Sequence, residues 1–160
     1  MTAQAPVPPD EYLYFLNRAF GGMLSALVEL GEPLATARPA LDGANSAYSI
    51  VFHCAEVAEY WIGHVFAGRP SARDRAAEFA AAGTLDELRT RIDAVTARIR
   101  ADLLGADFAA PPSNPPEPGY EGPERPLTRV GVLLHVLEEL AQHHGQVQLT
   151  RDLLLAGVKR

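Results

Sequence analysis

Three of the five histidines and two adjacent carboxylates share one short stretch near the end of the sequence, "HVLEELAQHHGQ" at residues 135–146. Imidazole nitrogens and carboxylate oxygens are donors that divalent transition metals use in proteins. On a helix, His135, Glu139 and His143 lie four residues apart on one face. The outer two are then about 12 Å apart along the axis. One ion can therefore use the pair His135/Glu139 or the pair Glu139/His143, but not all three residues.

A third ligand must come from another helix, and His53 is the leading candidate. It lies in "YSIVFHCAEVAEYW", where its apolar neighbours place the imidazole against the core or a pocket. Two imidazoles and one carboxylate, with a fourth position open, form the ligand set of many catalytic zinc sites. The simpler alternative is a hydrogen-bonded core histidine and a solvated Glu-His face. If the two helices run parallel, His135 is favoured as the partner of His53, because each lies about seven residues after the start of its helix.

Helical periodicity covers most of the chain, and no convincing alternating strand is present. Start and stop residues predict four long helices near residues 10–30, 46–67, 84–104 and 128–156. The expected caps are Asp10, Asn45 or Ser46, Thr84 in a capping box with Glu87, and Thr128. A small Ala-rich helix is expected near residues 72–82, and Gly21-Gly22 weakens the middle of the first helix.

The connection at residues 106–127 contains seven prolines, too many for a helix or a central strand. We therefore expect it to be irregular and exposed, and a connection of this length is commonly either disordered or the cover of a site. The predicted fold is an all-α four-helix bundle with this long Pro-rich connection before the last helix.

Composition favours one globular domain spanning residues 1–160. The formal net charge of −6 and the lack of a dense basic run argue against nucleic acid as a partner. No apolar run reaches the roughly 20 residues that cross a bilayer, so no membrane partner is expected. The single cysteine, Cys54, and the absence of a signal-peptide pattern predict a reducing cytoplasmic location.

Two segments, "GANSAYSIVFHCAEVAEYW" and "LTRVGVLLHVLEELAQHHGQVQLTRDLL", resemble the DinB/YfiT-like metalloenzymes. The resemblance is to the branch related to mycothiol-dependent S-transferases and to the metal-binding domain of mycothiol-dependent maleylpyruvate isomerase. In that family a cap such as Asn45-Ser46 precedes a histidine that matches His53. The last helix has His or Glu, three residues, then His followed closely by Gly, matched by Glu139, His143 and Gly145. The resemblance thus selects Glu139/His143 over His135/Glu139.

The resemblance implies a helical bundle, commonly a homodimer, that holds Zn²⁺, or Ni²⁺ or another transition metal. The metal would bind and ionise a low-molecular-weight thiol such as mycothiol, which then attacks a small electrophile. Tyr60, seven residues after His53, and Gln146, three after His143, are candidate residues for substrate binding. Cys54 is expected to serve in packing, because neighbouring helical residues point about 100° apart.

Two other functions remain open. In a metal-dependent hydrolase, water would occupy the open position and Glu56, about one turn after His53, would act as base. Alternatively, the protein is a non-catalytic stress-response protein that binds a metal or a small molecule, since a fold alone does not establish chemistry.

Overall fold

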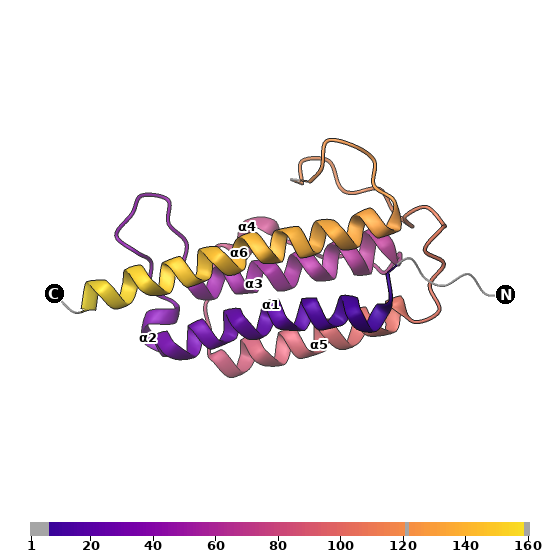
Figure 1. Cartoon of the computed structure of the whole chain (residues 1–160). Coiled ribbons are helices and arrows are strands. Elements are labelled where there is room, and N and C mark those ends of the chain that lie inside the picture. The colour runs from indigo at the N-terminus through magenta and orange to yellow at the C-terminus, as the bar shows by residue number, and fades with distance from the viewer. Residues whose placement is uncertain (1–6, 121, 159–160) are drawn as a thin grey trace.

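A computed structural model describes residues 7–120 and 122–158 of the chain (Figure 1). Its long helical segments are α1 (Pro9–Leu30), α3 (Ala47–Ala58) continued by the π-helix η1 (Glu59–Phe66), α5 (Leu85–Leu103) and α6 (Arg129–Val158). Two single-turn helices, α2 (Glu32–Ala35) and α4 (Arg75–Glu78), lie between them. These described residues contain no strand, which confirms the all-α prediction.

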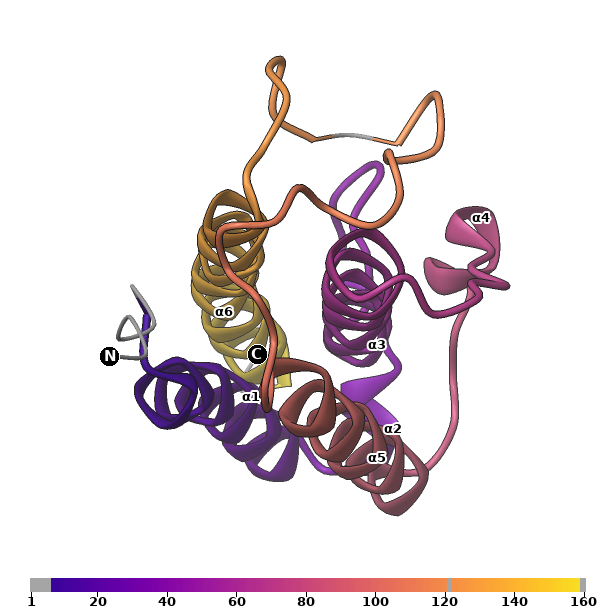
Figure 2. The ribbon, with the colours of Figure 1, turned by 90° about the vertical axis from the view of Figure 1, so that its right-hand side faces the viewer.

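The long helices form the predicted bundle, seen end-on in Figure 2. α1 packs between α5 and α6, and α3 packs against α6. The colours in Figure 1 show that α3 and α6 run in opposite directions along the bundle. Within the described part of the chain, no helix combines the length and apolarity needed to cross a membrane.

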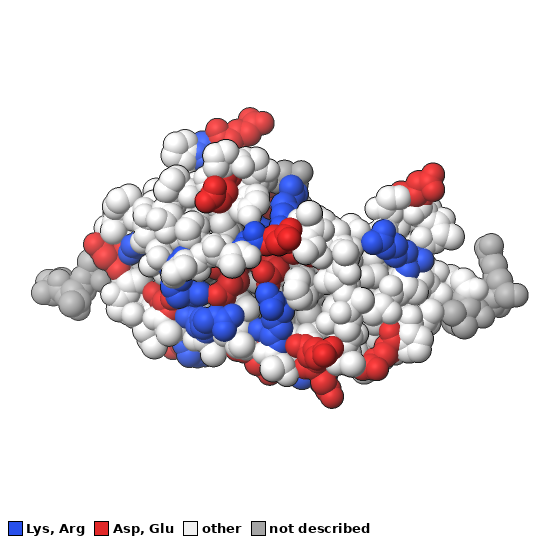
Figure 3. All heavy atoms as spheres, turned by 180° about the vertical axis from the view of Figure 1, so that it is seen from behind, with Lys and Arg blue, Asp and Glu red and all other residues white. Residues whose placement is uncertain are grey.

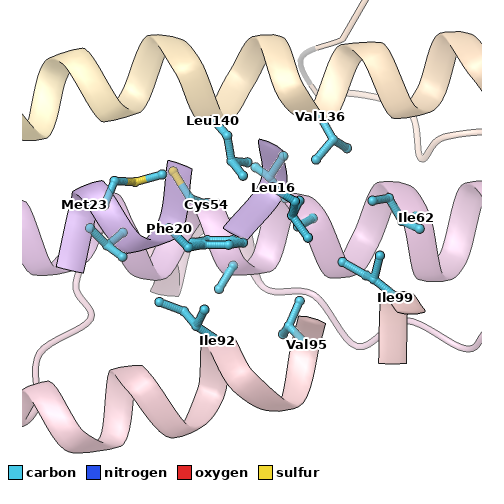
Figure 4. Packing of buried hydrophobic residues seen from close by; sticks show 14 of the residues in the cluster. Leu16, Phe20, Met23, Cys54, Ile62, Ile92, Val95, Ile99, Val136 and Leu140 are labelled. Atoms are coloured by element: carbon cyan, nitrogen blue, oxygen red, sulfur yellow. The ribbon is translucent and has the colours of Figure 1, made fainter. Parts of the chain in front are cut away.

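Aliphatic and aromatic side chains from every long helix fill the centre of the bundle (Figure 4). Leu16, Phe20 and Met23 come from α1, and Val136 and Leu140 from α6. Cys54 of α3 lies among them with none of its surface exposed. Burial, followed by the nearby charges of Glu139 and Glu78, raises the pKa of the Cys54 thiol. Cys54 is a packing residue, as the sequence predicted.

Side-chain caps fix the starts of three helices where the sequence placed them. Ser46 Oγ accepts a hydrogen bond from Ser49 N at 3.1 Å. Thr84 and Glu87 form the full capping box, and Thr128 Oγ1 accepts from Gly131 N at 3.0 Å.

The first helix begins differently from the prediction. Its cap is Pro8, so the assignment of that role to Asp10 was wrong. Pro9 can occupy the first turn because no intrahelical partner is available there for a backbone N–H. The helix also continues through Gly21-Gly22 without interruption. A Cβ at Gly22 would collide with the His144 imidazole, so this glycine permits the close approach of α6.

The described residues of the Pro-rich connection, 106–120 and 122–127, are irregular and mostly exposed, as predicted, and they cross the ends of α6 and η1 (Figure 2). Carbonyl groups at the end of a helix have no partners within the helix, and the connection supplies them. Asn114 Nδ2 donates to His64 O at 3.0 Å, Asn114 N to Val65 O at 3.2 Å, and Ser113 Oγ to Phe66 O at 2.9 Å. These bonds fasten the connection to the bundle.

Acidic and basic side chains lie next to one another on the face opposite to that of Figure 1 (Figure 3). Ion pairs here join the α3–η1 segment to α5. Arg91 Nε donates to Glu56 Oε1 at 2.8 Å, and Arg98 Nε donates to Glu59 Oε1 at 3.0 Å.

Candidate metal centre

Three predicted ligands meet between α3 and α6. His53 comes from α3, while Glu139 and His143 lie about one turn apart on α6. One donor atom from each residue lies within 4.8 Å of the other two. The two imidazole rings meet edge to face, with their centroids 4.9 Å apart. His53 is buried and the other two are half-buried, so the cluster lies at the edge of the core.

Hydrogen bonds on the far side of each imidazole orient the two rings. His53 Nδ1 is 2.6 Å from Glu78 Oε2, and His143 Nδ1 is 2.8 Å from Gln146 Oε1. An Nδ1 atom that donates to oxygen leaves the Nε2 lone pair free to bind a metal. His143 Nε2 is itself 3.6 Å from Glu139 Oε2. Both histidines are therefore oriented to offer Nε2 to a shared ion.

Glu78 is a buried carboxylate with two cationic or proton-donating neighbours. Arg73 Nε donates to Glu78 Oε1 at 2.6 Å, and Arg73 Nη2 donates to Oε2 at 3.1 Å. Burial alone would raise the pKa of Glu78, but the hydrogen bonds from His53 and Arg73 outweigh it, and the pKa lies below its ordinary value. An ionised Glu78 holds the His53 ring in place and fixes its tautomer.

The turn that carries Glu78 is much shorter than the helix predicted at residues 72–82. Only Arg75–Glu78 is helical, with Asp74 Oδ1 accepting from Ala77 N at 3.1 Å. The alanines around it have little apolar surface to bury, whereas the contacts of Glu78 with His53 and Arg73 hold this one turn. Sequence reasoning missed Glu78, because no spacing rule connects it with His53.

Glu139 and His143 form a coupled pair. The nearby His143 imidazole, with Nε2 3.6 Å from Glu139 Oε2, lowers the pKa of Glu139 against the opposing effect of burial. The Glu139 carboxylate in turn raises the pKa of His143, again against burial. Two imidazole nitrogens and one ionised carboxylate, converging within 4.8 Å, suit a divalent ion such as zinc. The donor set thus fits the metal that the sequence predicted.

His135 lies outside this cluster. Its ring packs edge to face on Trp61 with centroids 4.6 Å apart, and it is 94% buried. Neither ring nitrogen has a hydrogen-bond partner among the described residues. Of the two ligand pairs that spacing allowed, the structure brings Glu139/His143 to His53.

The cluster opens into a cavity of about 100 Å³. Its lining comprises His53, Val57, Trp61, Arg73, Arg75, Phe79, Tyr120, Glu139 and His143. The Arg73 guanidinium lies 5.0 Å from the centre of the Tyr120 ring, and the Tyr120 hydroxyl donates to Arg73 O at 3.2 Å. The Pro-rich connection therefore contributes Tyr120 to the wall of the site.

The other predicted site residues lie near the cluster without lining this cavity. The Tyr60 hydroxyl accepts a hydrogen bond from Glu117 N at 2.6 Å, and its ring packs against Trp61 and Tyr120. Gln146 is exposed and contacts His143 Nδ1. Substrate contact by Tyr60 and Gln146 stays a prediction. Glu56, the base of the hydrolase alternative, is bound to Arg91 and is not part of the cavity wall.

The fold and the cluster define a class: an all-α bundle in which two antiparallel helices bring two histidines and a glutamate together. The family model of the mycothiol S-transferases (Mycothiol-S-transferase) matches residues 12–156, and the chain belongs to this family. Searches of curated proteins and of solved structures gave no match.

Proposed function

We propose that this protein transfers a low-molecular-weight thiol, such as mycothiol, to a small electrophile with the help of a divalent metal. The observation that carries the proposal is the convergence of His53, Glu139 and His143, with both imidazoles oriented through Nδ1. The family match supports the thiol, since its members are mycothiol S-transferases.

Some side chains of the site would bind the ion, and others would form its surroundings. His53 and His143 would bind through Nε2 and Glu139 through its carboxylate, leaving one position for a fourth ligand. A divalent ion there supplies positive charge that favours the thiolate over the thiol. Glu78 and Gln146 keep the imidazoles oriented. Trp61, Phe79 and Tyr120 supply aromatic surface to the cavity wall.

In the proposed reaction, the thiol loses its proton to solvent and its sulfur attacks an electrophilic carbon. A carbon–sulfur bond forms as the bond to the leaving group breaks, and the leaving group keeps the electron pair. No protein nucleophile is required, in agreement with the fully buried Cys54.

Zinc is the proposed ion, although nickel or another transition metal would suit the same donors. The proposed location is the reducing cytoplasm, in line with the single cysteine. A homodimer is the proposed assembly, on the resemblance to a commonly dimeric family. Metal-dependent hydrolysis has less support, because Arg91 binds the carboxylate of Glu56.

Cobalt substitution tests the proposal. Purification without an affinity tag and metal analysis come first, followed by exchange of the native ion for Co²⁺ and addition of a small thiol. A sulfur-to-cobalt absorption band that grows with thiol concentration is expected, and it should persist in His135→Ala. A cobalt spectrum that does not change when thiol is added would contradict the proposed thiol transfer and favour a non-catalytic or hydrolytic site.

A further inference from the structure

A second, larger cavity lies beneath the Pro-rich connection. Its volume is about 630 Å³, within the range of sites for small organic molecules. Trp61 and Val65 of η1, Val132 of α6 and Leu127 of the connection contribute to its wall. Trp61 also lines the metal cavity, so one indole ring is a wall of both spaces.

The wall of this cavity is mostly apolar, although Asn114, Glu124 and Arg125 also line it. Five of the lining residues are prolines, Pro112, Pro115, Pro116, Pro123 and Pro126. Proline has no backbone N–H, and burying hydroxyl groups without partners is unfavourable. The proline, leucine, valine and tryptophan side chains of this wall suit an aryl or alkyl group.

The cavity is built into the structure by bonds that hold its cover. Asn114, itself part of the wall, bonds to the carbonyls of His64 and Val65. The Glu117 N–H donates to the Tyr60 hydroxyl. A Cβ at Gly122 would lie 2.9 Å from the Trp61 ring, so the connection approaches this ring closely. The cover is thus tied to η1, the same helix that supplies Trp61.

The metal cavity is too small for the body of an organic substrate. Its volume of about 100 Å³ has room for an ion and roughly two or three atoms the size of water, each needing about 30 Å³. The electrophilic carbon must nevertheless reach this space, so the remainder of the molecule must lie in an adjoining one.

We propose that the cavity beneath the Pro-rich connection binds the aryl or alkyl body of the electrophile, packed alongside Trp61, which also lines the metal cavity. This inference rests on the proposed transfer reaction. It names a substrate class: electrophiles whose reactive carbon carries an aryl or alkyl group.

Trp61 is the only tryptophan of the chain, so its fluorescence reports on the cavity directly. The probes are unreactive benzyl alcohols with para-alkyl chains of increasing length, added to metal-free protein without thiol. A saturable change in emission is expected, with affinity rising about fourfold for each buried methylene. Absence of saturable binding, or an affinity independent of chain length, would overturn the proposal.

Two variants locate the probe. Leu127→Asp puts a carboxylate into the wall and should weaken binding of the para-butyl probe at least tenfold. Leu149→Asp, at an exposed position of α6, is the matched control and should leave binding unchanged. If Leu127→Asp does not fold, Pro116→Asp at an exposed part of the wall replaces it. Equal binding to the folded wall variant and to the control would contradict the assignment.

Catalysis links the cavity to the reaction. With metal and thiol present, kcat/KM for para-alkylbenzyl chlorides should rise with chain length in the wild type and lose that dependence in the wall variant. Thiol binding to cobalt without probe binding would reject the cavity assignment alone. Probe binding without the cobalt–thiol band would reject the transfer function, and with it the assignment of this cavity to an electrophile.

Discussion

His53 Nδ1 lies 2.6 Å from Glu78 Oε2, and both side chains are buried. This contact makes Glu78 the residue that orients a proposed metal ligand without binding the metal. Replacing Glu78 with Gln keeps the shape but removes the charge that fixes the His53 tautomer. We expect metal affinity to fall about 10- to 100-fold, measured by competition with a chelator.

Glu138→Gln is the matched control for that experiment. Glu138 is an exposed carboxylate directly before Glu139, and its Oε2 lies 3.6 Å from His135 Nδ1. Its metal affinity should equal that of the wild type. Equal affinity in Glu78→Gln and Glu138→Gln would show that the buried carboxylate has no part in orienting His53.

Glu59, which lies outside the metal cluster, should make the stability of the protein depend on pH. Burial raises the pKa of Glu59, but hydrogen bonds from Arg69 and Arg98 outweigh it and lower the pKa below the ordinary 4.5. A lowered folded-state pKa gives stability that is present above pH 4.5 and lost as pH falls through the folded value. Glu59→Gln should therefore cost about 1 kcal/mol at pH 7, and this cost should shrink under acid.

Urea unfolding at pH 7 and at several values below 4.5 provides the measurement for Glu59. Asp86→Asn is the control, since Asp86 is 92% exposed in its pair with Arg89 and should change stability little at any pH. If Glu59→Gln lowers the free energy of unfolding by the same amount at every pH, the ion pairs of Glu59 do not stabilise the fold as proposed.

Tyr60→Phe tests the bond that fastens the Pro-rich connection. Loss of the hydroxyl leaves the Glu117 N–H without its 2.6 Å partner, which should cost about 1 kcal/mol. Amide exchange at Glu117 should accelerate about fivefold, while Tyr14→Phe, at a residue that is 58% exposed, should have no effect. Unchanged exchange at Glu117 would mean that the bond does not hold the connection in solution.

Much of the fold was readable from local sequence signals. Hydrophobic periodicity located the long helices, and Ser46, Thr84 and Thr128 fixed three of their starts because each satisfies free N–H groups of the first turn. The prolines at residues 106–127 excluded regular structure. Each of these signals depends on residues that are close in the sequence, so it can be recognised without knowledge of the fold.

The features that sequence reasoning missed depend on contacts between distant segments. Glu78 is separated from His53 by 25 residues and looks like any acidic residue in an Ala-rich segment. The π-helical continuation of α3 at Glu59–Phe66 also escaped prediction. Its hydrophobic pattern is that of a buried helix, and periodicity does not separate α from π geometry.

The direction of α6 relative to α3 decides which histidine meets His53. Depth from the helix starts would pair His53 with His135 in a parallel arrangement. The two helices are antiparallel (Figure 1), so moving from His53 toward Trp61 along α3 and η1 moves from His143 back toward His135 along α6. The contacts of His53 with His143 and of Trp61 with His135 are two steps of this one register.

The same register predicts the outcome of alanine replacements across the histidines. His53→Ala, Glu139→Ala and His143→Ala each leave two of three ligands, so each should lose metal by a similar large factor, about 100-fold or more in affinity. His135→Ala should retain metal, because its ring packs on Trp61. His144→Ala should also retain it, because its ring faces Gly22 of α1. Metal content of the purified variants, with folding checked by circular dichroism, decides between the two ligand pairs. Loss in His135→Ala with retention in His143→Ala would transfer the site to the other pair, and retention in all five variants would make the cluster a polar helix face without a metal.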